Sequence, residues 1–124
     1  QHNLSKFELV IVNLYPFEST IEQTKNMNTC IENIDIGGPS LIRAAAKNFL
    51  STAIVVDVND YNKILNEIKK YGGISLPLRK ILAVKAFKTT MKYDSIITNW
   101  MQDNFDSTES EDLTLLGKKI ESLF

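Results

Sequence analysis

Ala53-Ile54-Val55-Val56 is the stretch that decides the fold of this chain, together with an earlier run of the same kind, Leu9-Val10-Ile11-Val12. Both runs are short, continuous and apolar. They are rich in β-branched residues, which is typical of strands buried on both faces of a parallel sheet. About 40 residues separate them, including an expected helix from Pro39 to Asn48, which is enough for a crossover between parallel strands. The pattern therefore predicts an α/β fold.

After the second run, the sequence predicts two further helices. Residues 57–60 are typical of a turn and helix cap, apolar residues then recur at helical spacing over 61–68, and Gly72-Gly73 ends that helix. A long helix with a mostly apolar stripe is expected over 77–102. Residues 103–124 begin with an acidic stretch, interpreted as a linker or solvated turn, and end in an amphipathic segment.

This inventory contains too few strands for a complete domain. Two parallel strands do not make a stable sheet covered on both faces, because more strands are normally required. The remaining strands are expected from an upstream segment, from a partner chain or from strands that the pattern does not reveal. Gln1 is not an initiator methionine, which favours the upstream segment. We therefore treat the chain as part of a larger α/β domain.

The composition excludes several classes of function. With 14 basic and 15 acidic side chains, the net charge is −1, which gives no electrostatic reason to expect nucleic acid or an anionic membrane as partner. No apolar run approaches the roughly 20 residues that span a bilayer. Cys30 is the only cysteine, so it forms no internal disulfide, is expected to be a small buried hydrophobe and fits a reducing cytoplasm. No His, Cys and carboxylate cluster has metal-ligand spacing.

The stretch from Ile34 to Asn48 is the first candidate site. It delivers an acid, Asp35, and then Gly37-Gly38 onto a helix whose first position suits Pro39. The free N–H groups at a helix start attract anions or a developing negative oxygen, and Lys47 adds a cation within the same fifteen residues. These residue types predict a reaction site. The alternatives are that Asp35 is only a turn residue and that Lys47 complements the negative end of the helix.

A second candidate directly follows the first strand. In open α/β sheets ligands collect at the carboxyl ends of the strands, so Asn13-Leu14-Tyr15-Pro16-Phe17 is expected at that edge. Asn13 offers an amide donor and acceptor, and Tyr15 offers a hydroxyl that can donate to a carbonyl oxygen. The alternative is a loop whose aromatic side chains cover the end of the sheet.

The order of these motifs resembles one protein family. Val10-Ile11-Val12-Asn13-Leu14-Tyr15-Pro16-Phe17 is followed by Ile31-Glu32-Asn33-Ile34-Asp35-Ile36-Gly37-Gly38-Pro39 and by Leu41-Ile42-Arg43-Ala44-Ala45-Ala46-Lys47-Asn48. The series resembles the bifunctional purine biosynthesis family, which joins an IMP cyclohydrolase to a phosphoribosylaminoimidazolecarboxamide (AICAR) formyltransferase. The resemblance covers about Leu9 to Trp100, with 18–29 matching only loosely as an expected surface loop.

The resemblance implies a methylglyoxal-synthase-like, three-layer α/β/α fold with a mostly parallel sheet that is incomplete in this chain. Residues 1–102 would be the C-terminal part of the cyclohydrolase domain, and residues 103–124 would lead to the formyltransferase domain. The earlier strands and the loops that hold the substrate phosphate in the family are missing. The chain alone is therefore expected to be inactive.

The implied reaction is the dehydrative ring closure of 5-formamidoimidazole-4-carboxamide ribotide to IMP. The resemblance makes Lys47 the main proton donor or acceptor, lets Asp35 hold the carboxamide or relay its proton, and gives Tyr15 an assisting role at the reacting carbonyl. The residues implied to line the base are Val12, Asn13, Asp35 and Ile36. To these we add the amides of Gly37 and Gly38 as possible support for the oxyanion.

The implied step needs no metal or redox cofactor, whereas the formyltransferase half would use 10-formyltetrahydrofolate. The resemblance also implies a cytoplasmic homodimer. Two alternatives to a cyclohydrolase stay open: a methylglyoxal-synthase-like module that binds a nucleotide or phosphate ligand for regulation, and a non-enzymatic dimerisation domain with the helix over 77–102 as its interface.

Overall fold

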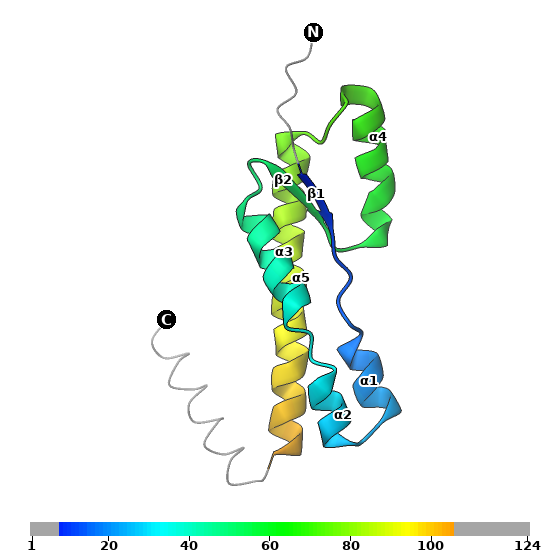
Figure 1. Cartoon of the computed structure of the whole chain (residues 1–124), viewed down its shortest axis with the longest axis vertical. Helices are drawn as coiled ribbons and strands as arrows, with labels where there is room; N and C mark the ends of the chain where they lie inside the picture. The colour runs from blue at the N-terminus through cyan, green and yellow to red at the C-terminus, as the bar shows by residue number, and fades with distance from the viewer. Residues whose placement is uncertain (1–7, 106–124) are drawn as a thin grey trace, which may run out of the picture.

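The computed structural model describes residues 8–105, which form a parallel two-stranded sheet surrounded by helices (Figure 1). The elements in chain order are β1 (Glu8–Ile11), α1 (Phe17–Gln23), α2 (Met27–Glu32), α3 (Gly37–Lys47), β2 (Thr52–Val55), the 3₁₀ turn η1 (Val58–Asp60), α4 (Tyr61–Tyr71) and α5 (Leu76–Asn104).

The two apolar runs form the two strands, as predicted. β1 and β2 are parallel, and their register pairs Glu8 with Thr52 and Ile11 with Val55. The crossover between them contains α1, α2 and α3. Every residue of β2 is buried, whereas Leu9 and Ile11 of β1 are 41% and 51% exposed. The sheet is therefore well covered at β2 and open at β1.

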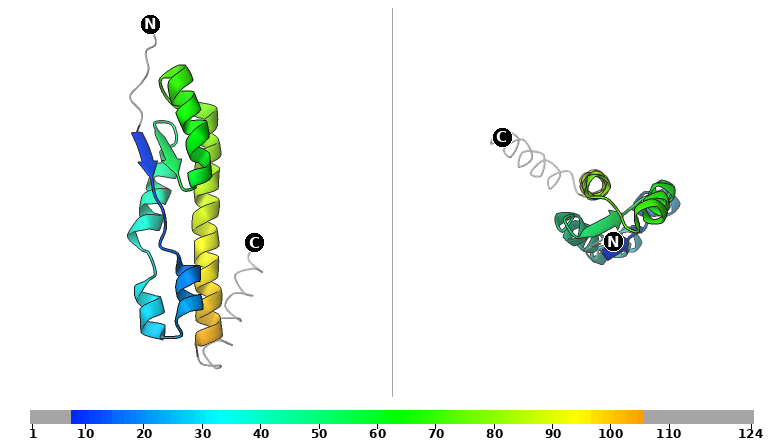
Figure 2. Two further views of the ribbon diagram at one scale, coloured as in Figure 1. Left: turned by 90° about the vertical axis from the view of Figure 1, so that its right-hand side faces the viewer. Right: turned by 90° about the horizontal axis from the view of Figure 1, so that it is seen from above.

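Three helices explain this asymmetry. α3 and α4 lie on opposite faces of the sheet, and α5 runs along the side of β2 (Figure 2). Ile54 packs with residues of α3 and α5 on one face, while Ala53 and Val55 pack with Ile64 of α4 and Leu82 of α5 on the other. Within residues 8–105, no strand pairs with the second edge of β1. The chain is thus an incomplete α/β/α unit.

The predicted helix boundaries agree closely with the structure. The Asp57 side chain accepts a hydrogen bond from the Asn59 amide, and Gly72 ends α4 with a φ of 74°, in the left-handed region that glycine adopts readily. Ser75 caps α5, which begins one residue before Pro77. α5 continues to Asn104, so the predicted acidic linker begins inside its last turn. Residues 106–124 lie outside the described part of the chain.

The surface loop expected over 18–29 is wrong. The structure has most of α1 and the first half of α2 there, both of them short helices. Phe17 and Cys30 are each 1% exposed and anchor these helices on Tyr93 of α5, while the Asn26 side chain caps α2. Helices of six or seven residues contribute too few apolar positions to give a periodic signal. The burial of Cys30 confirms its prediction as a small hydrophobe.

Candidate functional site

Asp35 connects two segments at the carboxyl end of β1. Its Oδ1 accepts a hydrogen bond of 2.7 Å from the Gly38 amide, and its Oδ2 accepts one of 3.3 Å from the Tyr15 amide. The first bond comes from one residue before the N-cap Ile36 and satisfies one of the free amides in the first turn of α3. The second ties the loop after β1 to the same carboxylate. Asp35 therefore holds the loop and the N-terminal end of α3 together.

Gly37 and Gly38, which precede Pro39, differ in how much room a side chain would have. A Cβ on Gly38 would lie 2.5 Å from Asp35 Oδ2, whereas a Cβ on Gly37 would meet nothing within 4 Å. α3 also begins at Gly37, two residues earlier than the start predicted at Pro39. The close approach of the capping carboxylate explains Gly38. The Gly38 amide donates to Asp35 and is therefore already occupied.

Tyr93 of α5 is a third partner of Asp35. The Asp35 backbone N–H donates a hydrogen bond of 2.8 Å to Tyr93 Oη. The Tyr93 side chain is buried, its ring lies edge-on to Phe17 at 6.4 Å, and burial raises the pKa of Tyr93. Tyr93 lies within the range from Leu9 to Trp100 that the resemblance covers, but no local pattern marks it as a site residue. Its contact with Asp35 spans 58 residues and could not be seen in the sequence.

The remaining candidates at this edge present exposed side chains. Tyr15 is 64% and Ile36 is 74% exposed, and Asn13 is exposed on the same loop. Val12 is the exception, because it is half-buried and packs against the core between α3 and the sheet. The alternative of a loop whose aromatic side chains pack against the protein therefore holds for Phe17, which is 1% exposed, but not for Tyr15, whose side chain is exposed.

A cavity of about 350 Å³ lies beside these residues. It is lined by Tyr15 and Pro16 of the loop, by the start of α1, and by Lys92 and Tyr93 of α5. The cavity adjoins the Asp35 site through Tyr15 and Tyr93, which both hydrogen-bond to Asp35, whereas Asp35 itself and the start of α3 do not line it.

Lys47 lies at the opposite end of α3. It is the last residue of the helix and is exposed, and the ten steps from Gly37 to Lys47 span about 15 Å at about 1.5 Å each. The lysine side chain is too short to return to Asp35. The prediction that the acid, the amides and the lysine meet in one site therefore does not hold within one copy of the chain. The reason is that α3 is one continuous helix, so Lys47 lies at the end of the helix that is far from Asp35.

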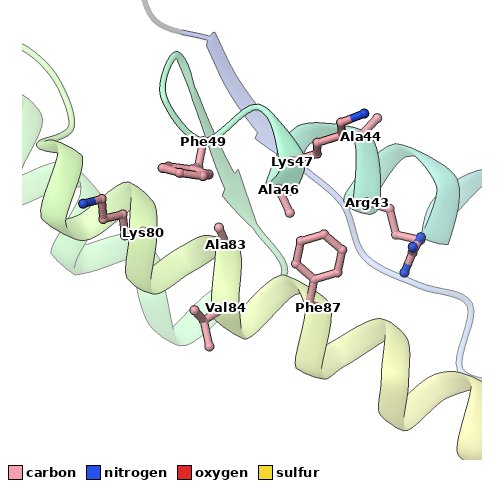
Figure 3. A pocket seen from close by; sticks show the side chains of 9 residues that line it. All are labelled: Arg43, Ala44, Ala46, Lys47, Phe49, Lys80, Ala83, Val84 and Phe87. Atoms are coloured by element: carbon pink, nitrogen blue, oxygen red, sulfur yellow. The ribbon is translucent and has the colours of Figure 1, made fainter.

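A second pocket is an apolar groove between α3 and α5. It has a volume of about 660 Å³, with Ala46 and Ala83 between the rings of Phe49 and Phe87 (Figure 3). The Arg43 guanidinium lies 5.4 Å from the centre of the Phe87 ring. Lys47 also lines this groove, but its ammonium group points away from the apolar gap (Figure 3). Chemistry that needs several polar groups at one point is not supported here.

No helix within residues 8–105 has an apolar stretch long enough to cross a membrane. In the same range, no three His, Cys, Asp or Glu side chains come together as metal ligands.

One family model and several known proteins are similar to this chain. The AICARFT/IMPCHase bienzyme family matches residues 45–123. The chain is 43% identical over 123 residues to the bifunctional purine biosynthesis protein PurH of Bradyrhizobium diazoefficiens, covering 98% of the chain and 23% of the relative. It is 40% identical over 124 residues to the PurH protein of Bacillus subtilis, with 99% and 24% coverage. The chain thus spans just under a quarter of the length of these relatives.

The structural comparison agrees with the sequence. The crystal structure of ForH is similar with a TM-score of 0.58 and 30% identity, over 73% of this chain and 48% of ForH. Because the family match includes well over half of the residues, this chain belongs to the AICARFT/IMPCHase bienzyme family.

Proposed function

We propose that this chain is the C-terminal part of an IMP cyclohydrolase domain, in a bifunctional protein that also carries AICAR formyltransferase activity. The reaction would be the ring closure of 5-formamidoimidazole-4-carboxamide ribotide to IMP. The observation that carries the proposal is the Asp35 carboxylate, held between the Tyr15 and Gly38 amides at the carboxyl edge of the sheet. Family membership supports the same reaction, since PurH relatives are purine biosynthesis proteins.

The geometry of this edge fits the demands of the reaction. The carboxamide nitrogen attacks the formyl carbon of the same molecule, a C–N bond forms, and the formyl oxygen leaves as water. Holding the two groups in line supplies much of the rate, because the reaction is intramolecular. Asn13 and the fixed Asp35 would orient the carboxamide, while the Gly37 amide at the positive helix end would face the developing negative oxygen. One such donor typically contributes roughly 10²–10³ in rate.

Lys47 enters this proposal through a second copy of the chain. As the expected proton donor or acceptor it must reach the reacting atoms near Asp35, but about 15 Å of α3 separates the two ends of that helix. A Lys47 that serves the Asp35 site would therefore come from the partner in the expected homodimer. Ile81, Val84 and Met91 of α5 are each more than half exposed and offer an apolar face for such a dimer.

The proposal also keeps the other expectations of the family. Ring closure transfers no electrons, so the step needs no redox cofactor, and 10-formyltetrahydrofolate would belong to the formyltransferase half. The reaction is placed in the cytoplasm. Residues 1–124 alone are expected to be inactive, because the ribotide phosphate would be held by segments that this chain does not include.

The test is ring closure by the intact bifunctional enzyme and its variants. Asp35→Ala and Lys47→Ala are each expected to lower kcat at least about a hundredfold, the range for loss of a group that moves a proton. Glu22→Gln, which changes an exposed acid on α1, is the matched control and is expected to keep turnover within about twofold. Turnover by Asp35→Ala equal to that of the control would overturn the proposal.

Mixing the two inactive variants tests the role of the second copy. If each site combines Asp35 of one subunit with Lys47 of the other, half of a random mixture is mixed dimer with one intact site. Activity would then recover to about a quarter of the wild-type value. No recovery, with both single variants inactive and dimeric, would show that Lys47 does not act across subunits.

A further inference from the structure

We propose that Tyr93 is a positioning residue that holds Asp35 in place for ring closure, an inference that rests on the proposed function. Tyr93 lies on α5, far from Asp35 in the sequence, and does not belong to the residues that the family resemblance implies for the site. Its hydroxyl oxygen accepts the Asp35 backbone N–H at 2.8 Å. Tyr93 would act only through Asp35 and would not touch the reacting atoms.

The hydrogen bond fixes a part of Asp35 that its other contacts leave free. Asp35 directs its carboxylate to the Gly38 and Tyr15 amides, and these bonds constrain the side chain. Its own backbone N–H precedes α3 and has no helical partner. Among residues 8–105, Tyr93 Oη is the only acceptor for that N–H. The tyrosine therefore completes a three-point attachment of Asp35 to the loop, to α3 and to α5.

The Tyr93 ring is itself held rigidly. It packs in a buried cluster with Phe17 and Cys30, and Phe17 lies edge-on to Trp100 at 5.6 Å. Burial raises the pKa of Tyr93, so the hydroxyl stays protonated and uncharged at neutral pH. A fixed, neutral oxygen at the end of a packed ring is suited to hold a backbone N–H at one position. The Asp35 backbone is thereby attached to the buried cluster that contains Tyr93.

Removing only the hydroxyl tests this role. Tyr93→Phe keeps the ring and its packing, while Asp35 loses one of three attachments. In the intact enzyme we expect kcat for ring closure to fall roughly ten- to a hundredfold, with KM within about twofold, because a small misplacement of a reacting group lowers the chemical step more than binding. Tyr71→Phe, which removes the hydroxyl of an exposed tyrosine on α4, is the matched control and is expected to match wild type.

A double variant separates positioning from general stability. If Tyr93 acts through Asp35, adding Tyr93→Phe to Asp35→Asn should lower kcat by less than about twofold further. A purely structural tyrosine would multiply the two losses, and it would lower the thermal midpoint together with kcat. All rates are measured well below the thermal midpoint of each variant, so that the folded enzyme is compared.

The outcomes are distinguishable. A wild-type enzyme that does not close the ring overturns the proposed function and, with it, this inference. An active wild type with unchanged kcat in Tyr93→Phe overturns the inference alone. Losses that multiply in the double variant do the same.

Discussion

At the scale of single residues, the start of α3 is built around one close contact. Asp35 places its carboxylate against the Gly38 amide at 2.7 Å, and only a residue without a Cβ leaves room for it. The neighbouring Gly37 has open space around its Cα. The pair therefore looks uniform in the sequence but has two different roles, a steric one at Gly38 and an available amide at Gly37.

This difference predicts opposite effects of alanine at the two glycines. Gly38→Ala would push its Cβ to 2.5 Å from Asp35 Oδ2, displace the cap and destabilise the chain by about 0.5–2 kcal/mol. Gly37→Ala meets no atom and should be neutral or stabilise by up to about 1 kcal/mol. Trp100 packs against Phe17, so its fluorescence reports urea unfolding of this region in the intact bifunctional protein.

The urea midpoints of the two variants test the predicted difference in stability. Gly38→Ala is expected to unfold at lower urea than wild type, and Gly37→Ala at the same or higher urea. Equal midpoints for the two variants would contradict the steric role given to Gly38.

Single residues also mark what the sequence could and could not predict about the site. Asp35 beside two glycines is a local pattern, and its alternative interpretation as a turn residue ahead of the helix agrees with the observed cap. The sequence does not reveal that Tyr93 contacts Asp35, because a contact between residues 58 positions apart depends on how α5 packs. The short sequence spacing between Asp35 and Lys47 predicts that they lie close together, but the continuous helix α3 places Lys47 at its far end.

At the scale of elements, Lys85 joins η1 to α5. Its Nζ lies 2.8 Å from Asp57 Oδ2 and 2.7 Å from Asp60 Oδ2, and the Asp60 side chain is only 7% exposed. The hydrogen bond from Lys85 holds the pKa of Asp57 below its ordinary value of 3.8. Hydrogen bonds to the two carboxylates raise the pKa of Lys85 above 10.5. The turn after β2 is thus held to the long helix by charge.

Replacing this lysine should make the chain less stable in a defined pH window. Lys85→Met leaves the buried Asp60 carboxylate without its cation, which costs on the order of 1–3 kcal/mol. Asp57 has a lowered pKa, so its contribution is present above pH 3.8 and is lost as the pH falls through the folded value. Lys85 has a raised pKa, so its contribution is present below pH 10.5 and is lost as the pH rises through the folded value.

The measurement is the thermal midpoint of wild type, Lys85→Met and the control Lys88→Met across pH. The gap between wild type and Lys85→Met should be widest between about pH 4 and 10 and should narrow outside that range. Lys88 is exposed on the same helix, so its variant should follow wild type. A gap that does not change with pH would contradict the ionic account.

Elements with a strong local signal were predictable. β2 is a continuous apolar run, and α4 and α5 have a capping residue at one end and apolar spacing along their length. α1 and α2 were not, because each is short and depends on burying Phe17 or Cys30 against α5. Their stability comes from tertiary packing, which the local sequence does not encode.

At the scale of the whole molecule, the sheet explains where a ligand belongs. α5 closes the β2 side, whereas the β1 side is open within residues 8–105 (Figure 2). Asp35, Tyr15 and the start of α3 gather at the carboxyl edge, where ligands of open α/β sheets bind. The larger groove between α3 and α5 is apolar and lies on a different face. The groove has the larger volume, but the polar groups that could orient a ligand lie at the carboxyl edge.

The position of bound IMP in the intact bifunctional enzyme tests this account most directly. A crystal structure of that complex should place the purine ring at the carboxyl edge, with polar atoms about 3 Å from groups of Asn13 and Asp35. A purine ring seated instead between Phe49 and Phe87, in the groove of α3 and α5, would contradict the account.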